Sequence, residues 1–94
     1  MLDYDLSERG AVSLYEYLYQ RIRDDILSGS ITAGEHLPSK RGLAQHLGIS
    51  VITVEGAYDQ LVAEGFVRSV PRRGYFANEL PQAAGRSLLK DVGD

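Results

Sequence analysis

Apolar residues in the first third of the chain recur every three to four positions, which is the spacing of an amphipathic helix. Four of them follow one another at four-residue intervals: Leu14, Leu18, Ile22 and Ile26. Ser13 stands just before this stretch and Gly29 just after it, and both are residue types that often cap helix ends. The pattern therefore predicts a helix over residues 14–28.

Two further stretches with helical spacing lie close together in the middle of the chain. Residues 40–47 follow Ser39 and end before Gly48, which predicts a short helix. Residues 50–64 begin at a serine and stop before a glycine, and one face of this predicted helix carries Val54, Ala57, Tyr58, Leu61 and Val62. A short helix, a tight turn containing glycine and a second capped helix are typical of a helix-turn-helix.

The spacing of apolar residues changes from helical to alternating after Gly65. Aromatic and β-branched residues flank the sequence PRRG at residues 71–74, which predicts a β-hairpin over residues 66–77. The predicted fold is therefore mainly α with a small β-hairpin, a winged helix-turn-helix of three helices plus a wing. We expect residues 13–77 to form this domain, preceded by a loosely held lead-in over residues 1–12.

Residues 78–94 contain a proline, an Ala-Ala-Gly sequence and one weak apolar pair, so they are expected to be a linker or the truncated start of a following domain. A chain of 94 residues has room for one domain. It contains no cysteine, no apolar stretch of membrane-spanning length, and no recognisable catalytic pair, phosphate loop or metal cluster. We therefore expect a cytoplasmic protein that is not an enzyme, with no membrane contact and no catalytic or metal-binding residues.

The net charge of −3 conceals an uneven distribution along the chain. Residues 1–35 carry seven acidic and three basic residues, whereas residues 36–77 carry three acidic and five basic residues. An acidic start followed by a mildly basic middle is compatible with a small DNA-binding domain whose cationic face is local.

The middle of the chain also carries many unlike residue types at fixed spacings. The most specific strings are LPSKRGLAQHLGIS at residues 37–50, AYDQLVAEGF at 57–66 and RGYF at 73–76. Together with their flanks, over about residues 14–77, they resemble the winged-helix DNA-binding domain of GntR-type bacterial transcription regulators. This resemblance implies binding to double-stranded DNA by a homodimer in the intact protein.

Within that family, AYDQLVAEGF followed by PRRGYF is most similar to the MocR type. There a linker joins this domain to a large domain that resembles a fold-type I aminotransferase and binds pyridoxal phosphate. The resemblance implies that these 94 residues are a fragment without a cofactor of its own, with pyridoxal phosphate bound in a missing C-terminal domain. A short GntR regulator of another subgroup is the alternative.

Candidate DNA contacts fall in three places: the start of the second helix (Ser39, Lys40 and Arg41), the first turn of the third helix (Ser50, Val51, Ile52 and Thr53), and the hairpin tip (Arg72, Arg73 and Gly74). A helix N-terminus beside an arginine attracts phosphate, and arginines on a wing reach a minor groove or the DNA backbone. The alternative is a set of ordinary caps and solvated cations. Gly74 is expected to supply a positive φ at the turn.

The third helix departs from the common pattern of the family, in which many members have arginine where Val51 stands. Apolar contact with a thymine methyl group would explain Val51 and Ile52, whereas packing against the first helix or a dimer partner is the alternative. Glu55 is assigned no contact. Tyr58 is expected in the core, although its hydroxyl group is also a candidate for touching a phosphate.

The resulting hypothesis is sequence-specific DNA binding by the N-terminal domain of a bacterial transcription regulator, with helix 50–64 in the major groove and hairpin 66–77 as the wing. The competing hypothesis is a winged-helix module for protein–protein interaction, which the acidic total charge favours.

Overall fold

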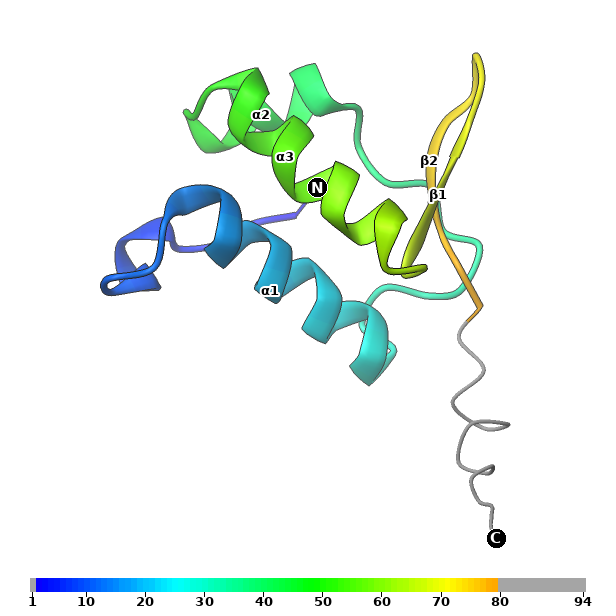
Figure 1. Ribbon diagram of the computed structural model, residues 1–94, viewed down its shortest axis with the longest axis horizontal. Helices are drawn as coiled ribbons and strands as arrows, with labels where there is room; N and C mark the ends of the chain where they lie inside the picture. Colours follow the sequence, from blue (N-terminus) through cyan, green and yellow to red (C-terminus); the bar gives the residue numbers. More distant parts are fainter. Residues whose placement is uncertain (1, 80–94) are drawn as a thin grey trace, which may run out of the picture.

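Three helices and a two-stranded antiparallel hairpin make up the fold in a computed structural model that describes residues 2–79 (Figure 1). The helices are α1 (Leu14–Ser28), α2 (Lys40–Leu47) and α3 (Val51–Ala63). The hairpin consists of β1 (Val67–Val70) and β2 (Gly74–Ala77). The predicted order of elements is confirmed, and the predicted helix 50–64 is one residue too long at each end.

The same type of cap begins each of the three helices. The side chains of Ser13, Ser39 and Ser50 each accept a hydrogen bond from the backbone amide three residues further on. At the other end, α1 and α2 stop at Gly29 and Gly48, with φ angles of 90° and 72°. These positive φ angles favour glycine, so the helix bounds follow from local chemistry.

The core lies where α3 packs between α1 and α2. The predicted face of α3 is correct for Val54, Ala57, Tyr58 and Leu61, all of them fully buried. It is wrong for Val62, which is 36% exposed because it lies at the edge of the apolar stripe rather than within it. No helix within residues 2–79 is both long and apolar enough to cross a membrane.

Strand β2 has hydrogen-bonded neighbours on both of its edges. On one edge it pairs with β1 in a register that places Val67 opposite Ala77 and Val70 opposite Gly74. On the other edge the connection between α1 and α2 runs beside it: the Leu37 amide donates to the Tyr75 carbonyl at 2.8 Å, and the Gly34 amide to the Ala77 carbonyl at 2.8 Å. The hairpin is therefore attached to the helical part of the domain through β2 and the α1–α2 connection.

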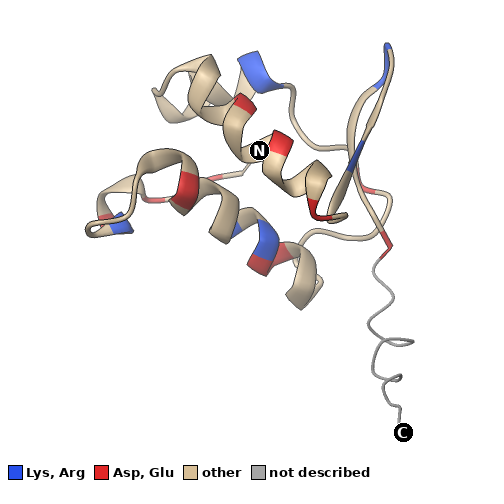
Figure 2. Ribbon diagram, in the orientation of Figure 1, with Lys and Arg blue, Asp and Glu red and all other residues tan. Residues whose placement is uncertain are grey.

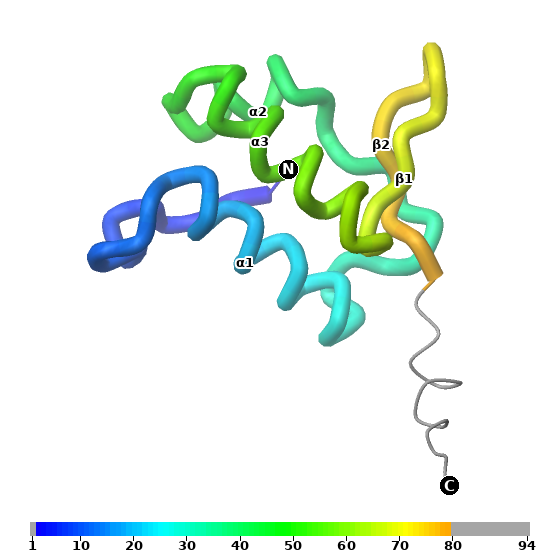
Figure 3. Tube along the Cα trace, viewed as in Figure 1, coloured from blue at the N-terminus to red at the C-terminus, as the bar shows by residue number. Residues whose placement is uncertain are grey.

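The expectation that residues 1–12 are loosely held is wrong for Leu2, Tyr4 and the 3₁₀ helix that follows them. Leu2 and Tyr4 pack against the core, and the Tyr4 hydroxyl group donates to Asp25 Oδ2 at 2.7 Å. The segment continues into a short 3₁₀ helix, Leu6–Arg9, which contacts α1 (Figure 3). Apolar and polar residues alternate over residues 2–6, so an extended segment turns one apolar edge toward the helices.

At the other end, only Asn78 and Glu79 of the expected linker lie within the described residues. Asn78 is held at the base of the hairpin, where its backbone amide donates to the Phe66 carbonyl at 2.9 Å and its side chain to the Gly65 carbonyl at 2.8 Å. The rest of the expected linker, residues 80–94, lies outside the described part of the chain.

Candidate nucleic-acid interface

Parts of α2, α3 and β2 form an open groove of about 430 Å³, called here the wing groove. It is lined by Ser39, Lys40, Arg41, Val51, Glu55, Gly74 and Tyr75. Five of these seven residues are candidate DNA contacts, and together they represent all three places that the sequence indicated: Ser39, Lys40, Arg41, Val51 and Gly74. The other candidates, Ser50, Ile52, Thr53, Arg72 and Arg73, do not line the groove but belong to the same α3 turn and the same hairpin.

At the start of α2, Ser39 is the N-cap and accepts a hydrogen bond from the Gly42 amide at 3.0 Å. Lys40 forms an ion pair with Glu55 of α3, with 3.0 Å between Nζ and Oε2. The hydrogen bond to Glu55 raises the pKa of Lys40 above its usual value. Arg41 is exposed, and no acidic side chain within residues 2–79 forms an ion pair with it.

The first turn of α3 combines satisfied polar groups with exposed apolar ones. Ser50 accepts a hydrogen bond from the Thr53 amide at 3.1 Å, and the two hydroxyl oxygens are 2.8 Å apart. Val51 is 37% exposed and Ile52 is 78% exposed. Packing of Ile52 against the first helix, one of the alternatives from the sequence, is therefore excluded.

The hairpin tip is a tight turn with two exposed arginines. The Arg73 amide donates to the Val70 carbonyl at 2.9 Å, and Pro71 occupies the second position of the turn. Arg72, at the third position, has a φ of 68°, which makes it the one residue other than glycine with a positive φ within residues 2–79. This combination corresponds to a type II turn, whose third position favours glycine.

Gly74 has the positive φ that the sequence predicted, at 113°. A second constraint was not predicted: a Cβ atom at this position would lie 2.8 Å from His36 Nε2. His36 stacks on Phe76 with ring centroids 4.8 Å apart, so its ring is held beside the base of the turn. The backbone conformation therefore favours glycine here, and a Cβ atom would in addition displace the His36 ring.

Tyr58 supports the site from the core and does not contact solvent. It is fully buried, and its hydroxyl group donates to the Pro38 carbonyl at 2.8 Å, directly before the Ser39 cap. Burial and the neighbouring Tyr75 raise the pKa of the Tyr58 hydroxyl. A phosphate contact by this hydroxyl is therefore excluded, and the expectation that Tyr58 belongs to the core is confirmed.

Positive charge gathers at two ends of this surface. Figure 2 shows basic residues at the start of α2 and at the tip of the hairpin, whereas α1 carries acidic and basic residues together. The Lys40–Glu55 ion pair reduces the net positive charge at the α2 end. Sequence reasoning missed this pair, because the angle at which α2 and α3 cross decides which side chains meet.

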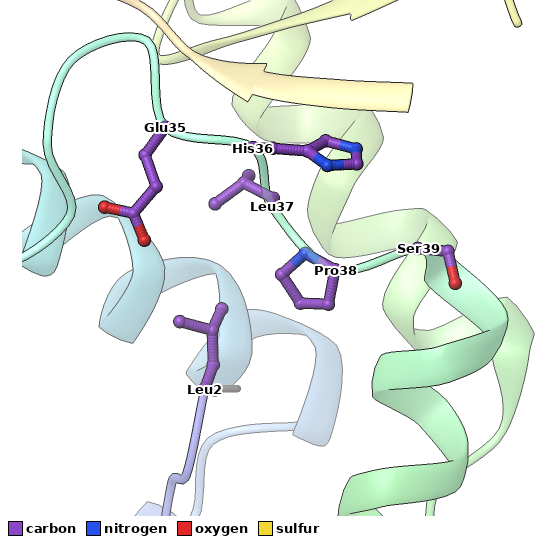
Figure 4. A pocket seen from close by; sticks show the side chains of 6 residues that line it. All are labelled: Leu2, Glu35, His36, Leu37, Pro38 and Ser39. Carbon is purple, nitrogen blue, oxygen red and sulfur yellow. The ribbon is translucent and has the colours of Figure 1, made fainter. Parts of the chain in front are cut away.

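A second hollow, of about 420 Å³, lies on the side of the α1–α2 connection where Leu2 approaches Leu37 and Pro38 (Figure 4). Its other lining residues are Glu35, His36 and Ser39. Glu35 accepts a hydrogen bond from the Thr32 amide at 2.9 Å. With an acidic side chain and neither lysine nor arginine in its lining, this hollow is unsuited to a phosphate backbone.

Comparison with known proteins places the same region of the chain in one family. Residues 14–76 match the family described as bacterial regulatory proteins, gntR family. The uncharacterized HTH-type transcriptional regulator YhdI of Bacillus subtilis is 45% identical over 75 residues, which cover 80% of this chain and 16% of YhdI. The probable rhizopine catabolism regulatory protein MocR of Rhizobium meliloti is 38% identical over 73 residues, which cover 78% of this chain and 15% of MocR.

Solved structures have the same arrangement of helices and wing. YtrA from Sulfolobus acidocaldarius, a GntR-family transcription factor, superposes with a TM-score of 0.73 at 31% identity, covering 90% of each chain. The DNA-binding domain of AraR, in complex with operator ORE1, superposes with a TM-score of 0.67 at 26% identity, covering 82% of this chain and 94% of that one. The predicted winged helix-turn-helix is therefore confirmed.

Proposed function

This chain belongs to the gntR family of bacterial regulatory proteins, as a winged-helix DNA-binding domain, and we propose that it recognises duplex DNA of defined sequence with α3 in the major groove and the hairpin as the wing. The AraR domain has the same fold, and its solved structure is a complex with operator ORE1. The chain spans about one sixth of the length of these relatives, 16% of YhdI and 15% of MocR.

The observation that carries the proposal is the meeting of the α2 start, the α3 start and the wing around one groove. The N-termini of α2 and α3 offer backbone amides and the positive end of the helix dipole. Exposed arginines stand at both sides, Arg41 on α2 and Arg72 with Arg73 on the wing. Arginine side chains and helix N-termini are groups that contact DNA phosphates and position a protein on the duplex.

The candidate residues then divide into two roles. Arg41, Arg72 and Arg73 contact phosphates, helped by the amides and hydroxyl groups of Ser39, Ser50 and Thr53, while Val51 and Ile52 face the base edges. Lys40 contributes less than a free lysine, because Glu55 neutralises it. Gly74 contributes by allowing the turn that presents the two wing arginines.

In the intact protein we propose a homodimer in the bacterial cytoplasm, with one winged helix on each of two half-sites. The spacing of the two half-sites would then equal the distance between the α3 helices of the two subunits. Regulation of transcription, rather than catalysis, is the role that the named relatives indicate.

A salt titration of the 94-residue chain tests the proposal. Duplexes are first selected from a random library by the chain itself, with a shuffled duplex as the control probe. We expect Arg41→Ala and the double variant Arg72→Ala/Arg73→Ala to bind more weakly. The slope of log K against log[salt] should flatten by about 0.9 for each lost phosphate contact.

Arg21→Ala is the matched control, because Arg21 is an exposed arginine on α1, away from the wing groove. It should leave affinity and slope unchanged. Equal affinity and slope for all variants would overturn the assigned contacts. If wild type binds the selected and the shuffled duplex equally weakly, sequence-specific DNA recognition is overturned. The competing hypothesis, a module for protein–protein interaction, is then favoured.

A further inference from the structure

Ile52 is the most exposed of the large apolar residues within residues 2–79. It is 78% exposed, compared with 50% for Leu27 and 37% for its neighbour Val51. It occupies the second position of α3, directly after the Ser50 cap and Val51. The most accessible apolar side chain of the domain is thus placed at the end of the helix that the proposed function puts into the major groove.

The polar groups around Ile52 already have partners within the chain. The Ser50 and Thr53 hydroxyl groups bond to each other at 2.8 Å. The Glu55 carboxylate, one turn further along, is paired with Lys40 at 3.0 Å. The first turn of α3 therefore presents an aliphatic surface beside polar groups that are hydrogen-bonded or ion-paired within the chain.

The first two turns of α3 lack the side chains that read purines. Residues 51–58 are VITVEGAY and include neither arginine, lysine, asparagine nor glutamine. Bidentate hydrogen bonds to guanine or adenine require one of those residues. The feature of a major groove that suits an aliphatic side chain is the C5-methyl group of thymine.

We propose that Ile52, supported by Val51, is a specificity-determining residue that recognises thymine through its C5-methyl group. This inference rests on the proposed function. DNA is preferred over a second protein chain as the occupant of this surface because Val51, the neighbour of Ile52, lines the wing groove together with the exposed Arg41 and the start of α2. An exposed arginine beside a helix N-terminus attracts a phosphate backbone.

The test compares thymine with uracil, which differ only in this methyl group. Each thymine of a duplex selected by the wild-type chain is replaced in turn with deoxyuridine, and affinity is measured for wild type, Ile52→Ala and Val62→Ala. Val62 is the matched control, an exposed valine near the other end of α3. Circular dichroism and sedimentation confirm that each variant has the helical content and the mass of wild type.

We expect one or two thymines whose replacement weakens wild-type binding by about fourfold, the effect of one buried methyl group. Ile52→Ala should bind the thymine duplex and its deoxyuridine-substituted form with equal affinity. Val62→Ala should prefer the thymine duplex by the same factor as wild type. The inference is overturned if no thymine matters, if Ile52→Ala still discriminates, or if Ile52→Ala changes only the oligomeric state. Those outcomes leave DNA binding intact, whereas a failure to select any duplex would overturn the proposed function itself.

Discussion

At the scale of single residues, Arg72 occupies a backbone conformation that an arginine adopts at a cost. Its φ of 68° lies in the left-handed region, where a residue other than glycine is destabilised by about 1 kcal/mol or more. The residue is nevertheless one of the two exposed arginines that we propose as phosphate contacts of the wing. The turn thus combines a strained backbone with a charge at a point that faces DNA in the proposed function.

We predict that Arg72→Gly separates these two effects. Relief of the positive φ should raise the free energy of unfolding by about 1 kcal/mol, while loss of the guanidinium group should weaken binding to a selected duplex. Urea denaturation measures the first effect and a salt titration the second. Arg73→Gly is the control, since Arg73 lacks a positive φ and should lose affinity without gaining stability. Equal stability changes in the two variants would contradict the argument.

At the scale of elements, the helices and the hairpin could be predicted because their signals are local. A serine begins each helix, and Gly29 and Gly48 end the first two at positive φ, as their positions in the sequence indicated. The Pro/Gly turn likewise marked the hairpin. Local patterns of this kind need no knowledge of how the elements pack.

Features that depend on packing could not be predicted in the same way. The Lys40–Glu55 ion pair and the alignment of residues 34–37 with β2 join segments whose proximity only the folded chain defines. The docking of Leu2 and Tyr4 was missed because a short alternating segment has no sustained period. The sequence therefore predicted three separate places for the candidate site. The structure shows that residues from all three line one groove.

The contact between α1 and α3 gives a prediction about pH. Hydrogen bonds from Tyr19 first, and then from Gln60, lower the pKa of Glu64 below its ordinary value of 4.5. The ionised carboxylate therefore stabilises the fold above pH 4.5, and this contribution is lost as the pH falls through the lowered pKa. Glu64→Gln should lower the free energy of unfolding at pH 7, and the difference from wild type should shrink in more acidic buffer.

Urea denaturation at several pH values measures this effect. Tyr19→Phe provides the matched variant, because it removes the hydroxyl donor and leaves the carboxylate in place. In the Tyr19→Phe background, Glu64→Gln should cost less at pH 7 than it does in wild type. A difference between wild type and Glu64→Gln that is the same at pH 7 and at pH 3 would contradict the assignment.

At the scale of the whole molecule, the domain is small, so its first residues matter for stability. A core of this size leaves little excess of burial over conformational entropy. Leu2 and Tyr4 extend that core, and Tyr4 adds a hydrogen bond to Asp25. The segment that the sequence assigned to a lead-in is therefore part of the folded unit.

Deletion of residues 1–12 should accordingly lower the free energy of unfolding by about 2 kcal/mol, from lost apolar contact and the lost hydrogen bonds between Tyr4 and Asp25 and between Asp3 and His46. In a domain of this length that corresponds to a fall in Tm of about 10 °C. Thermal unfolding followed by circular dichroism measures the change. Tyr4→Phe, which removes only the hydroxyl group, should cost about half as much. An unchanged Tm after the deletion would show that the docked segment contributes no stability.

The anchoring of Asn78 has a consequence for how this domain combines with others. Its bonds to Gly65 and Phe66 hold the chain at the end of the hairpin opposite the arginine turn (Figure 1). Whatever is joined after Glu79 starts from the side that faces away from the proposed DNA surface. We expect that a fluorescent reporter fused directly after Glu79 leaves DNA binding by the domain unchanged. Residue 79 and the proposed DNA surface thus lie at opposite ends of the hairpin, an arrangement suited to fusion proteins.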